Sequence, residues 1–125
     1  MSERMDQFAA ELLLKTQSNK LEWIPVQLDP DEEEFSIDLG EGYRFHALSS
    51  RSGEDRDITL QLFHDQRILD EAAVKNWSLR SDPRMDTGYI KRFRLYSDLV
   101  DAVRENLPGG EKDFNAVEQL LRKIS

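Results

Sequence analysis

The two histidines, His46 and His64, have the side chains best suited to acid–base or metal chemistry near neutral pH. A metal centre also needs His, Asp or Glu side chains that converge at fixed spacing. The chain has no His-x-x-x-His pattern or other strong ligand spacing. Two interpretations stay open. Either both histidines lie on the surface, or one of them is a metal ligand or general base in a small enzyme.

Other motifs that carry chemistry are missing from the sequence. Gly40-Glu41-Gly42 is expected to join two strands and places a carboxylate at its centre, so it does not suit a phosphate. The chain has no cysteine, which excludes disulfides, thiolate zinc sites and a cysteine nucleophile. The acidic segment Asp29–Glu34 contains Pro30 and five carboxylates, a composition typical of an exposed, solvated loop. These observations favour a protein that is not an enzyme and has no cofactor.

The histidines belong to a segment, Phe35–Ile68, in which apolar and polar residues alternate. Period two is typical of strands with one buried face. The apolar positions form three runs: Phe35, Ile37, Leu39; Tyr43, Phe45, Ala47; and Ile58, Leu60, Leu62. A tight hairpin at 40–42 would pair residue 39 with 43, 38 with 44, 37 with 45 and 36 with 46, with Gly42 in the left-handed position of a three-residue loop.

The same alternation places polar side chains on the opposite face of the sheet. These candidate binding residues are Asp38, Arg44, His46, Thr59 and Gln61, with Ser36 beside them. In the expected register Asp38 faces Arg44 across the ladder. We expect this face to have no cover, so that a partner or ligand could lie across it.

The remaining segments predict the elements that cover the apolar face. Residues 3–18 form a helix with an apolar stripe, and Leu21–Trp23 form a strand that Pro25 ends or marks as an edge. Arg67–Leu69 continue the sheet, and Asp70–Lys75 suggest a helical turn. Ser81-Asp82-Pro83 resemble a helix start.

From Tyr89 to Leu107 the spacing is helical, with a strand over 89–95 as the competing interpretation. Pro108-Gly109-Gly110 would end that helix. Residues Phe114, Val117, Leu120, Leu121 and Ile124 then form one face of a last amphipathic helix. Together the elements predict one α+β domain, 1–125. It is an antiparallel β-meander of four to five strands, with an N-terminal helix and two C-terminal helices packed on one face.

Basic residues concentrate between Lys75 and Arg94, where six cations face two carboxylates and aromatic residues are interleaved. Such a mixture is typical of an anion or single-stranded nucleic-acid site, with Arg92 and Arg94 as candidate contacts. Tyr89, Phe93 and Tyr96 also fall on the core stripe of the expected helix, and burial there would prevent base stacking. Nucleic acid is therefore a weaker alternative.

The net charge of −8 lies in the first half of the chain. Residues 1–66 carry 15 acidic and 6 basic side chains, so this half would repel nucleic acid and attract a basic protein. The sequence has no apolar run long enough for a bilayer and no signal-peptide pattern, so we expect a cytoplasmic protein. A homodimer through an edge strand such as 21–24 or 67–69 is a further expectation.

A resemblance runs through Phe8, Leu12-Leu13, Thr16, Leu21-Glu22-Trp23 and Leu95-Tyr96. In these residues the chain resembles small, largely uncharacterised bacterial proteins with an N-terminal helix followed by a leucine-x-tryptophan strand. It departs from them at Asn19-Lys20, where a glycine is common. The resemblance implies a bacterial origin and an α+β fold, and it implies no activity.

Two classes of function follow from the sequence. The first is a protein-interaction module of the immunity, antitoxin or adaptor kind, which binds a protein partner through the polar sheet face and the acidic segment. The alternative is a small metal-dependent or histidine-assisted enzyme, or a weak nucleic-acid binder through residues 75–94.

Overall fold

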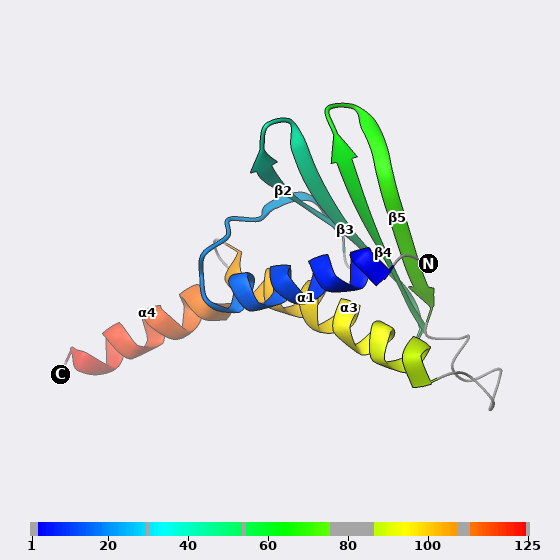
Figure 1. Ribbon diagram of the computed structural model, residues 1–125. Helices are drawn as coiled ribbons and strands as arrows, with labels where there is room; N and C mark the ends of the chain where they lie inside the picture. Colours follow the sequence, from blue (N-terminus) through cyan, green and yellow to red (C-terminus); the bar gives the residue numbers. More distant parts are fainter. Residues whose placement is uncertain (1–2, 30, 54, 76–86, 108–110, 125) are drawn as a thin grey trace.

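The structure is a computed structural model that describes residues 3–29, 31–53, 55–75, 87–107 and 111–124. Its elements follow one another as α1 (Glu3–Gln17), β1 (Ile24–Leu28), β2 (Glu32–Gly40), β3 (Tyr43–Ser52), β4 (Asp55–His64), β5 (Arg67–Lys75), α3 (Thr87–Asn106) and α4 (Glu111–Lys123). The predicted α+β fold, with its N-terminal helix, antiparallel meander and two C-terminal helices, is confirmed (Figure 1). The interpretations of Ser81-Asp82-Pro83 and of Pro108-Gly109-Gly110 fall outside the described residues.

The five strands form one antiparallel sheet in the order β1-β2-β3-β4-β5, so each strand pairs with its neighbours in the sequence. The expected pairs Ser36–His46, Ile37–Phe45 and Asp38–Arg44 are present. The register shifts after Asp38, so that Gly40 pairs with Tyr43 and the three-residue loop was a wrong prediction. Glu41 and Gly42 both have positive φ, 56° and 84°, which matches the two-residue turns whose twist fits a hairpin.

Two strand boundaries differ from the sequence prediction. The first strand is Ile24–Leu28 rather than 21–23, and Pro25 lies inside it, opposite Phe35. Proline is tolerated there because β1 is an edge strand that pairs on one side only. Asp70–Lys75 continue strand β5 and do not form a helical turn. Their deciding feature is period two, since Ala72 and Val74 are both buried against the core.

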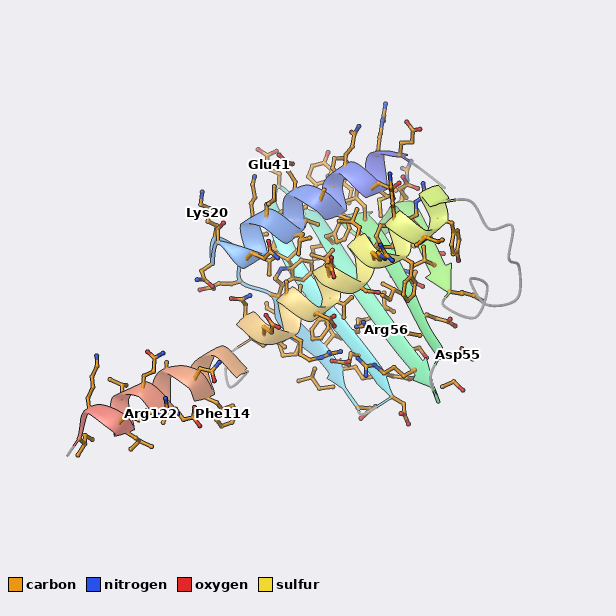
Figure 2. The ribbon with its side chains drawn as sticks, turned by 90° about the horizontal axis from the view of Figure 1, so that it is seen from below. Lys20, Glu41, Asp55, Arg56, Phe114 and Arg122 are labelled. Atoms are coloured by element: carbon orange, nitrogen blue, oxygen red, sulfur yellow. The ribbon has the colours of Figure 1, made fainter. Side chains whose placement is uncertain are left out.

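Helices α1 and α3 lie side by side across one face of the sheet and run in the same direction (Figures 1 and 2). The strand interpretation of residues 89–95 is therefore wrong. The core between the layers contains the predicted sheet residues Phe35, Ile37, Phe45, Ala47, Ile58 and Leu60 and the helix residues Met5, Ala9, Leu12, Tyr96, Leu99, Val100 and Val103. Because the apolar stripes of two helices meet the apolar face of one sheet, this two-layer packing buries all three.

The last helix, α4, behaves differently from α1 and α3. It extends past the C-terminal end of α3 and away from the sheet (Figure 1). Its apolar residues Phe114, Val117, Leu120 and Leu121, and Ile124 directly after it, are all at least half exposed. The helix was predicted correctly, but its apolar stripe is not buried against the sheet as the sequence suggested. None of the described helices has the length and apolarity needed to cross a bilayer.

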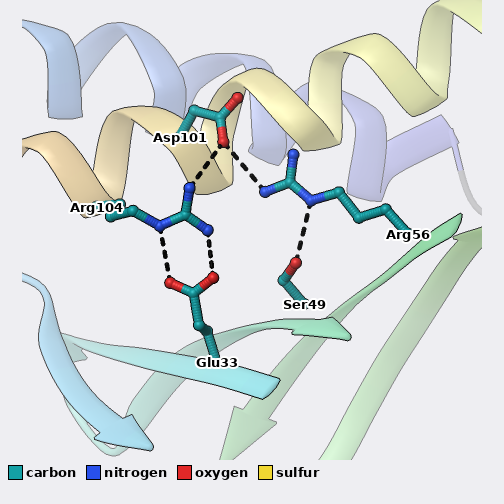
Figure 3. A network of polar contacts seen from close by, with 5 residues as sticks. All are labelled: Glu33, Ser49, Arg56, Asp101 and Arg104. Atoms are coloured by element: carbon teal, nitrogen blue, oxygen red, sulfur yellow. Dashed lines mark hydrogen bonds and ion pairs between the residues drawn. The ribbon is translucent and has the colours of Figure 1, made fainter. Parts of the chain in front are cut away.

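Polar contacts hold the helices onto the sheet at defined positions. Figure 3 shows one network, in which Arg104 of α3 pairs with both carboxylate oxygens of Glu33 in β2. Arg104 also approaches Asp101 at 3.4 Å, and Asp101 accepts a hydrogen bond from Arg56 of β4 at 3.1 Å. Arg56 in turn donates to the hydroxyl of Ser49 in β3. The network therefore joins α3 to three strands of the sheet.

A second polar cluster joins α1 to α3. The carboxylate of Asp6 accepts hydrogen bonds from Nε of Arg92 at 2.8 and 2.9 Å and from the hydroxyl of Tyr96 at 2.6 Å. Burial acts to raise the pKa of Asp6, but the hydrogen bonds from Arg92 and Tyr96 outweigh it and leave that pKa below its ordinary value. For the Tyr96 hydroxyl, burial and the bond to Asp6 both raise the pKa. Asp6 is thus held as a carboxylate between the two helices.

Candidate functional site

The face of the sheet turned away from α1 and α3 has no cover among the described elements (Figure 1). We call it the open face. It is defined by four rows of residues that are paired from β2 to β5: Glu32–Ser50–Asp57–Lys75, Glu34–Leu48–Thr59–Ala73, Ser36–His46–Gln61–Glu71 and Asp38–Arg44–Phe63–Ile68. Strand parity places all of them except Ile68 opposite the buried residues of the same strands. The register shift between β4 and β5 brings Ile68 to this face, where it pairs with Phe63.

Five of the predicted site residues lie together on this face. They are Asp38, Arg44, His46, Thr59 and Gln61. His46 and Gln61 are direct neighbours in one row, where Cβ atoms of paired residues are about 5 Å apart. The Gln61 amide donates to Oε2 of Glu71 at 2.8 Å, and the Ser36 hydroxyl lies 3.4 Å from Nε2 of His46. The row therefore presents a line of paired polar groups across four strands.

His46 is half-buried at the centre of the open face, and its ring packs against Phe63 with centroids 4.9 Å apart. Burial lowers the pKa of its imidazole, Glu34 acts in the opposite sense, and Arg44 lowers it further. The net effect is a pKa below the ordinary value, so the ring is neutral at pH 7 and can both donate and accept a hydrogen bond. Within the described residues, no group of three His, Cys, Asp or Glu side chains could hold a metal ion.

Asp38 and Arg44 are paired in the ladder, but their side chains bind different partners. Asp38 accepts a hydrogen bond from the N–H of Gly40 at 2.8 Å, which closes the β2–β3 turn. Arg44 donates to the backbone carbonyl of Asp65 at 3.2 Å, which ties that hairpin to the β4–β5 turn. Both groups remain exposed at the turn end of the open face.

His64 does not belong to the open face. It pairs with Tyr43, and the two rings stack with centroids 4.2 Å apart. Its Nε2 lies 3.9 Å from a carboxylate oxygen of the neighbouring Asp65. The ring therefore packs between the tips of the two hairpins, away from His46.

The acidic segment is only in part the exposed loop that the sequence indicated, since Asp29 and Asp31 lie outside the strands and are exposed. Glu32, Glu33 and Glu34 belong to strand β2, and alternation divides them between the two faces. Glu33 points to the helical side, where its side chain is 13% exposed and pairs with Arg104. Glu32 and Glu34 fall on the open face. Because Glu32–Glu34 belong to the sheet, the carboxylates of Glu32 and Glu34 contribute to the charge of the open face, while the carboxylate of Glu33 forms an ion pair on the helical side.

Acidic groups outnumber basic groups on the open face. Its four rows contain five carboxylates, Glu32, Glu34, Asp38, Asp57 and Glu71, and two cations, Arg44 and Lys75, which gives a net charge of −3. A shallow hollow of about 390 Å³ lies at its acidic end, among Glu32, Glu34, Asp57 and Thr59. The face therefore offers a surface that is complementary to positive charge.

The other two predicted site residues, Arg92 and Arg94, lie on α3, on the far side of the sheet from the open face. They were predicted as contacts of a separate nucleic-acid site, and they do not join the residues of the open face. Arg92 is bound to Asp6, and Tyr96, one of the aromatic residues proposed to accompany it, is fully buried. Arg94 is exposed. The packing of α3 against α1 thus uses Arg92 and Tyr96, two contributors to the proposed nucleic-acid site.

The sequence prediction missed Phe63, Ile68 and Glu71 on the open face. The alternation of Ile58, Leu60 and Leu62 already implies that Phe63 lies opposite them, since it follows Thr59 and Gln61. Glu71 was missed because residues 70–75 were assigned to a helical turn. A continued period-two pattern through Ala72 and Val74 is the signal that identifies it.

Comparisons with known proteins found no relative of this chain. No protein-family model, no curated protein and no solved structure matches the chain.

Proposed function

We propose that this protein is a non-enzymatic interaction module of a bacterial cytoplasm, of the immunity, antitoxin or adaptor kind. It binds a basic protein partner through the open face. The observation that carries the proposal is a difference in cover and charge between the two faces of the sheet. One is closed by α1 and α3, while the other has no cover among the described elements and carries a net charge of −3.

The centre of the open face has features found in protein interfaces. His46, Phe63 and Ile68 form an apolar and aromatic patch, with Phe63 partly buried and Ile68 47% exposed. Binding energy in interfaces concentrates in such central apolar residues, and a polar rim surrounds them. Here Asp38, Arg44 and Glu71 provide that rim.

The charge of the rim supports a basic partner. Acidic and basic surfaces attract each other over distances of about 8–10 Å at physiological salt, which speeds encounter and disfavours acidic competitors. Glu32, Glu34 and Asp57 line the hollow at one end of the face together with Lys75, and because carboxylates outnumber the cation there, Lys or Arg side chains of a partner would be accommodated. The histidine-assisted enzyme remains the alternative, with His46 as its candidate residue.

An NMR titration with a lysine- and arginine-rich peptide tests the proposal directly. We expect amide shifts in ¹⁵N spectra to cluster on the outward residues of β2–β5, and the affinity to fall as salt is raised. The face variant Glu34→Gln/Glu71→Gln should bind at least fivefold more weakly. The matched control Asp98→Asn/Glu105→Gln removes the same charge from exposed positions of α3, and it should bind as the wild type does.

The opposite result is equally clear. Shifts spread over α1, α3 and α4, or equal weakening by the face and control variants, would show that the peptide senses only net charge. In that case the open face is a solvated sheet surface. Retention of host proteins by the wild type and the control, together with their loss from the face variant, would identify the natural partner.

A further inference from the structure

Helix α4 presents a complete apolar face to solvent. Every described side chain from Phe114 to Ile124 is exposed, and the five apolar ones are 52–75% exposed. Spacing of three and four residues places the four within α4, Phe114, Val117, Leu120 and Leu121, on one side of the helix, and Ile124 follows its last residue. Isolated helices of about 13 residues are marginal in water, because their stability comes from packing of the apolar face. A cover for this face is therefore expected.

The same chain contains a groove of the matching kind. A cavity of about 620 Å³ lies between α1 and the β2–β3 hairpin. Its apolar walls include Phe8, Leu39 and Tyr43, which are 39–47% exposed, and Leu62 at its base. Charged side chains, Glu11, Lys15 and Glu41, stand around it. The groove is thus apolar inside and charged at its margin.

The α4 helix does not fill the groove of the same chain. The C-terminal end of α3 is held at the start of β2 by the pair between Arg104 and Glu33. The groove lies at the other end of β2, at Leu39, six residues and about 20 Å further along the strand. From α3, α4 runs away from the sheet and not along it (Figures 1 and 2). The groove that covers the apolar face of α4 is therefore expected on another molecule.

We propose that the occupant of the groove is α4 of a second copy of this chain, so that two copies exchange these helices reciprocally. Charges at the two surfaces are complementary. Arg122 and Lys123 suit Glu11 and Glu41 at the groove margin, while Glu118 suits Lys15. A reciprocal exchange also closes the assembly at two copies around a two-fold axis.

The surface area that would be buried favours reciprocal exchange of α4 helices over simple pairing of two α4 helices with each other. Five such side chains remove on the order of 500 Å² from water at 60–120 Å² each. With the smaller surface of the groove counted, one inserted helix buries roughly 650 Å² and two inserted helices bury roughly 1,300 Å². Stable dimers bury about 1,200–2,000 Å². Two α4 helices packed on each other would reach only about 1,000 Å².

Sedimentation equilibrium of three single variants tests the exchange. Leu121→Asp alters α4, Leu39→Asp alters the groove, and Leu14→Asp places the same charge at an exposed α1 position outside the groove. We expect the wild type and Leu14→Asp to be dimers. The dissociation constant should rise at least 100-fold in Leu121→Asp and in Leu39→Asp. Unchanged circular dichroism would show that both variants are folded.

Mixing the two defective variants distinguishes the possible arrangements. Leu39→Asp retains an intact α4 and Leu121→Asp retains an intact groove. A differently tagged mixture should therefore form a heterodimer through one correct insertion, with an affinity below that of the wild-type dimer and above that of either variant alone. A wild type that stays monomeric at 1 mM overturns the proposal, as does a Leu39→Asp variant that dimerises normally, which would indicate α4–α4 pairing. Binding of α4 to a different protein by a monomeric wild type would also overturn it.

Discussion

Replacing Asp6 with asparagine should remove the negative charge and one of the two acceptor oxygens between α1 and α3 while keeping the volume of the side chain. The carboxylate receives Nε and Nη2 of Arg92 at 2.7–2.9 Å and the hydroxyl of Tyr96 at 2.6 Å. The Asp6 and Arg92 side chains are 27% and 19% exposed. Their environment is therefore intermediate between a surface pair, which contributes 0–1 kcal/mol, and a buried one, whose disruption costs about 3–5 kcal/mol. We expect the free energy of unfolding at pH 7 to fall by about 2 kcal/mol.

The effect should depend on pH with a defined sign. Since the folded-state pKa of Asp6 lies below its ordinary value, the contribution is fully present above that ordinary value, near 4. It is lost as the pH falls through the lowered folded-state pKa. Urea denaturation of the wild type and Asp6→Asn, followed by circular dichroism, should therefore give curves that converge below pH 4.

Two further measurements decide whether this reasoning holds. In a double-mutant cycle, Asp6→Asn and Arg92→Met should couple by about 1–2 kcal/mol. The control Glu11→Gln, an exposed carboxylate on the same helix, should change stability by less than about 0.5 kcal/mol. If Asp6→Asn unfolds with the wild-type free energy at pH 7, or if the difference persists unchanged at pH 2, the ion pair does not hold the helices together.

Three more predictions concern other contacts. Thr16→Val should cost about 1–3 kcal/mol, measured by urea denaturation, because Nε1 of the buried Trp23 donates to the Thr16 hydroxyl at 2.9 Å and would lose its acceptor; Thr16→Ser should be much milder. Arg104→Met should destabilise the fold by about 1–3 kcal/mol, since it leaves the carboxylate of Glu33 without its bidentate partner in a site that is 13% exposed, and a Glu33→Gln background should remove most of that loss. The imidazole of His46 should titrate by NMR below its ordinary pKa of 6.5, so its contribution to stability is complete above pH 6.5 and declines as the pH falls below it; titration at or above 6.5 would contradict the burial argument.

The sequence predicted the sheet well because alternation is a local signal. The pairing of Ser36 with His46 and of Ile37 with Phe45 follows from period two and a short turn alone. Pro25 was predicted to end the first strand or to mark it as an edge, and the edge alternative is confirmed. The helical turn suggested at Asp70–Lys75 was wrong, because residue preferences were given more weight than pairing. An edge strand can include a proline, and an alanine-rich segment becomes a strand when a neighbouring strand supplies its hydrogen bonds.

The candidate site was predicted in part for the same reason. Parity brought His46, Thr59 and Gln61 together correctly, because the three share one face of adjacent strands. It could not show that Arg92 would bind Asp6, since the two residues are 86 positions apart and only the packing of α3 against α1 brings them together. Nor does composition reveal that Glu33 points inward to Arg104 while its neighbours point outward.

The contact between α1 and α3 also sets the order in which the fold can form during synthesis on the ribosome. Every β-strand pairs with its neighbour in the sequence, so the hairpins can form soon after they leave the exit tunnel. Helix α1 is made first, but Asp6 meets Arg92 only after 86 further residues have been added, about 4–17 s later at 5–20 residues per second. During that interval the apolar stripe of α1 can pack on the described strands but not yet on α3, and the helical layer is complete only after α3 has been made.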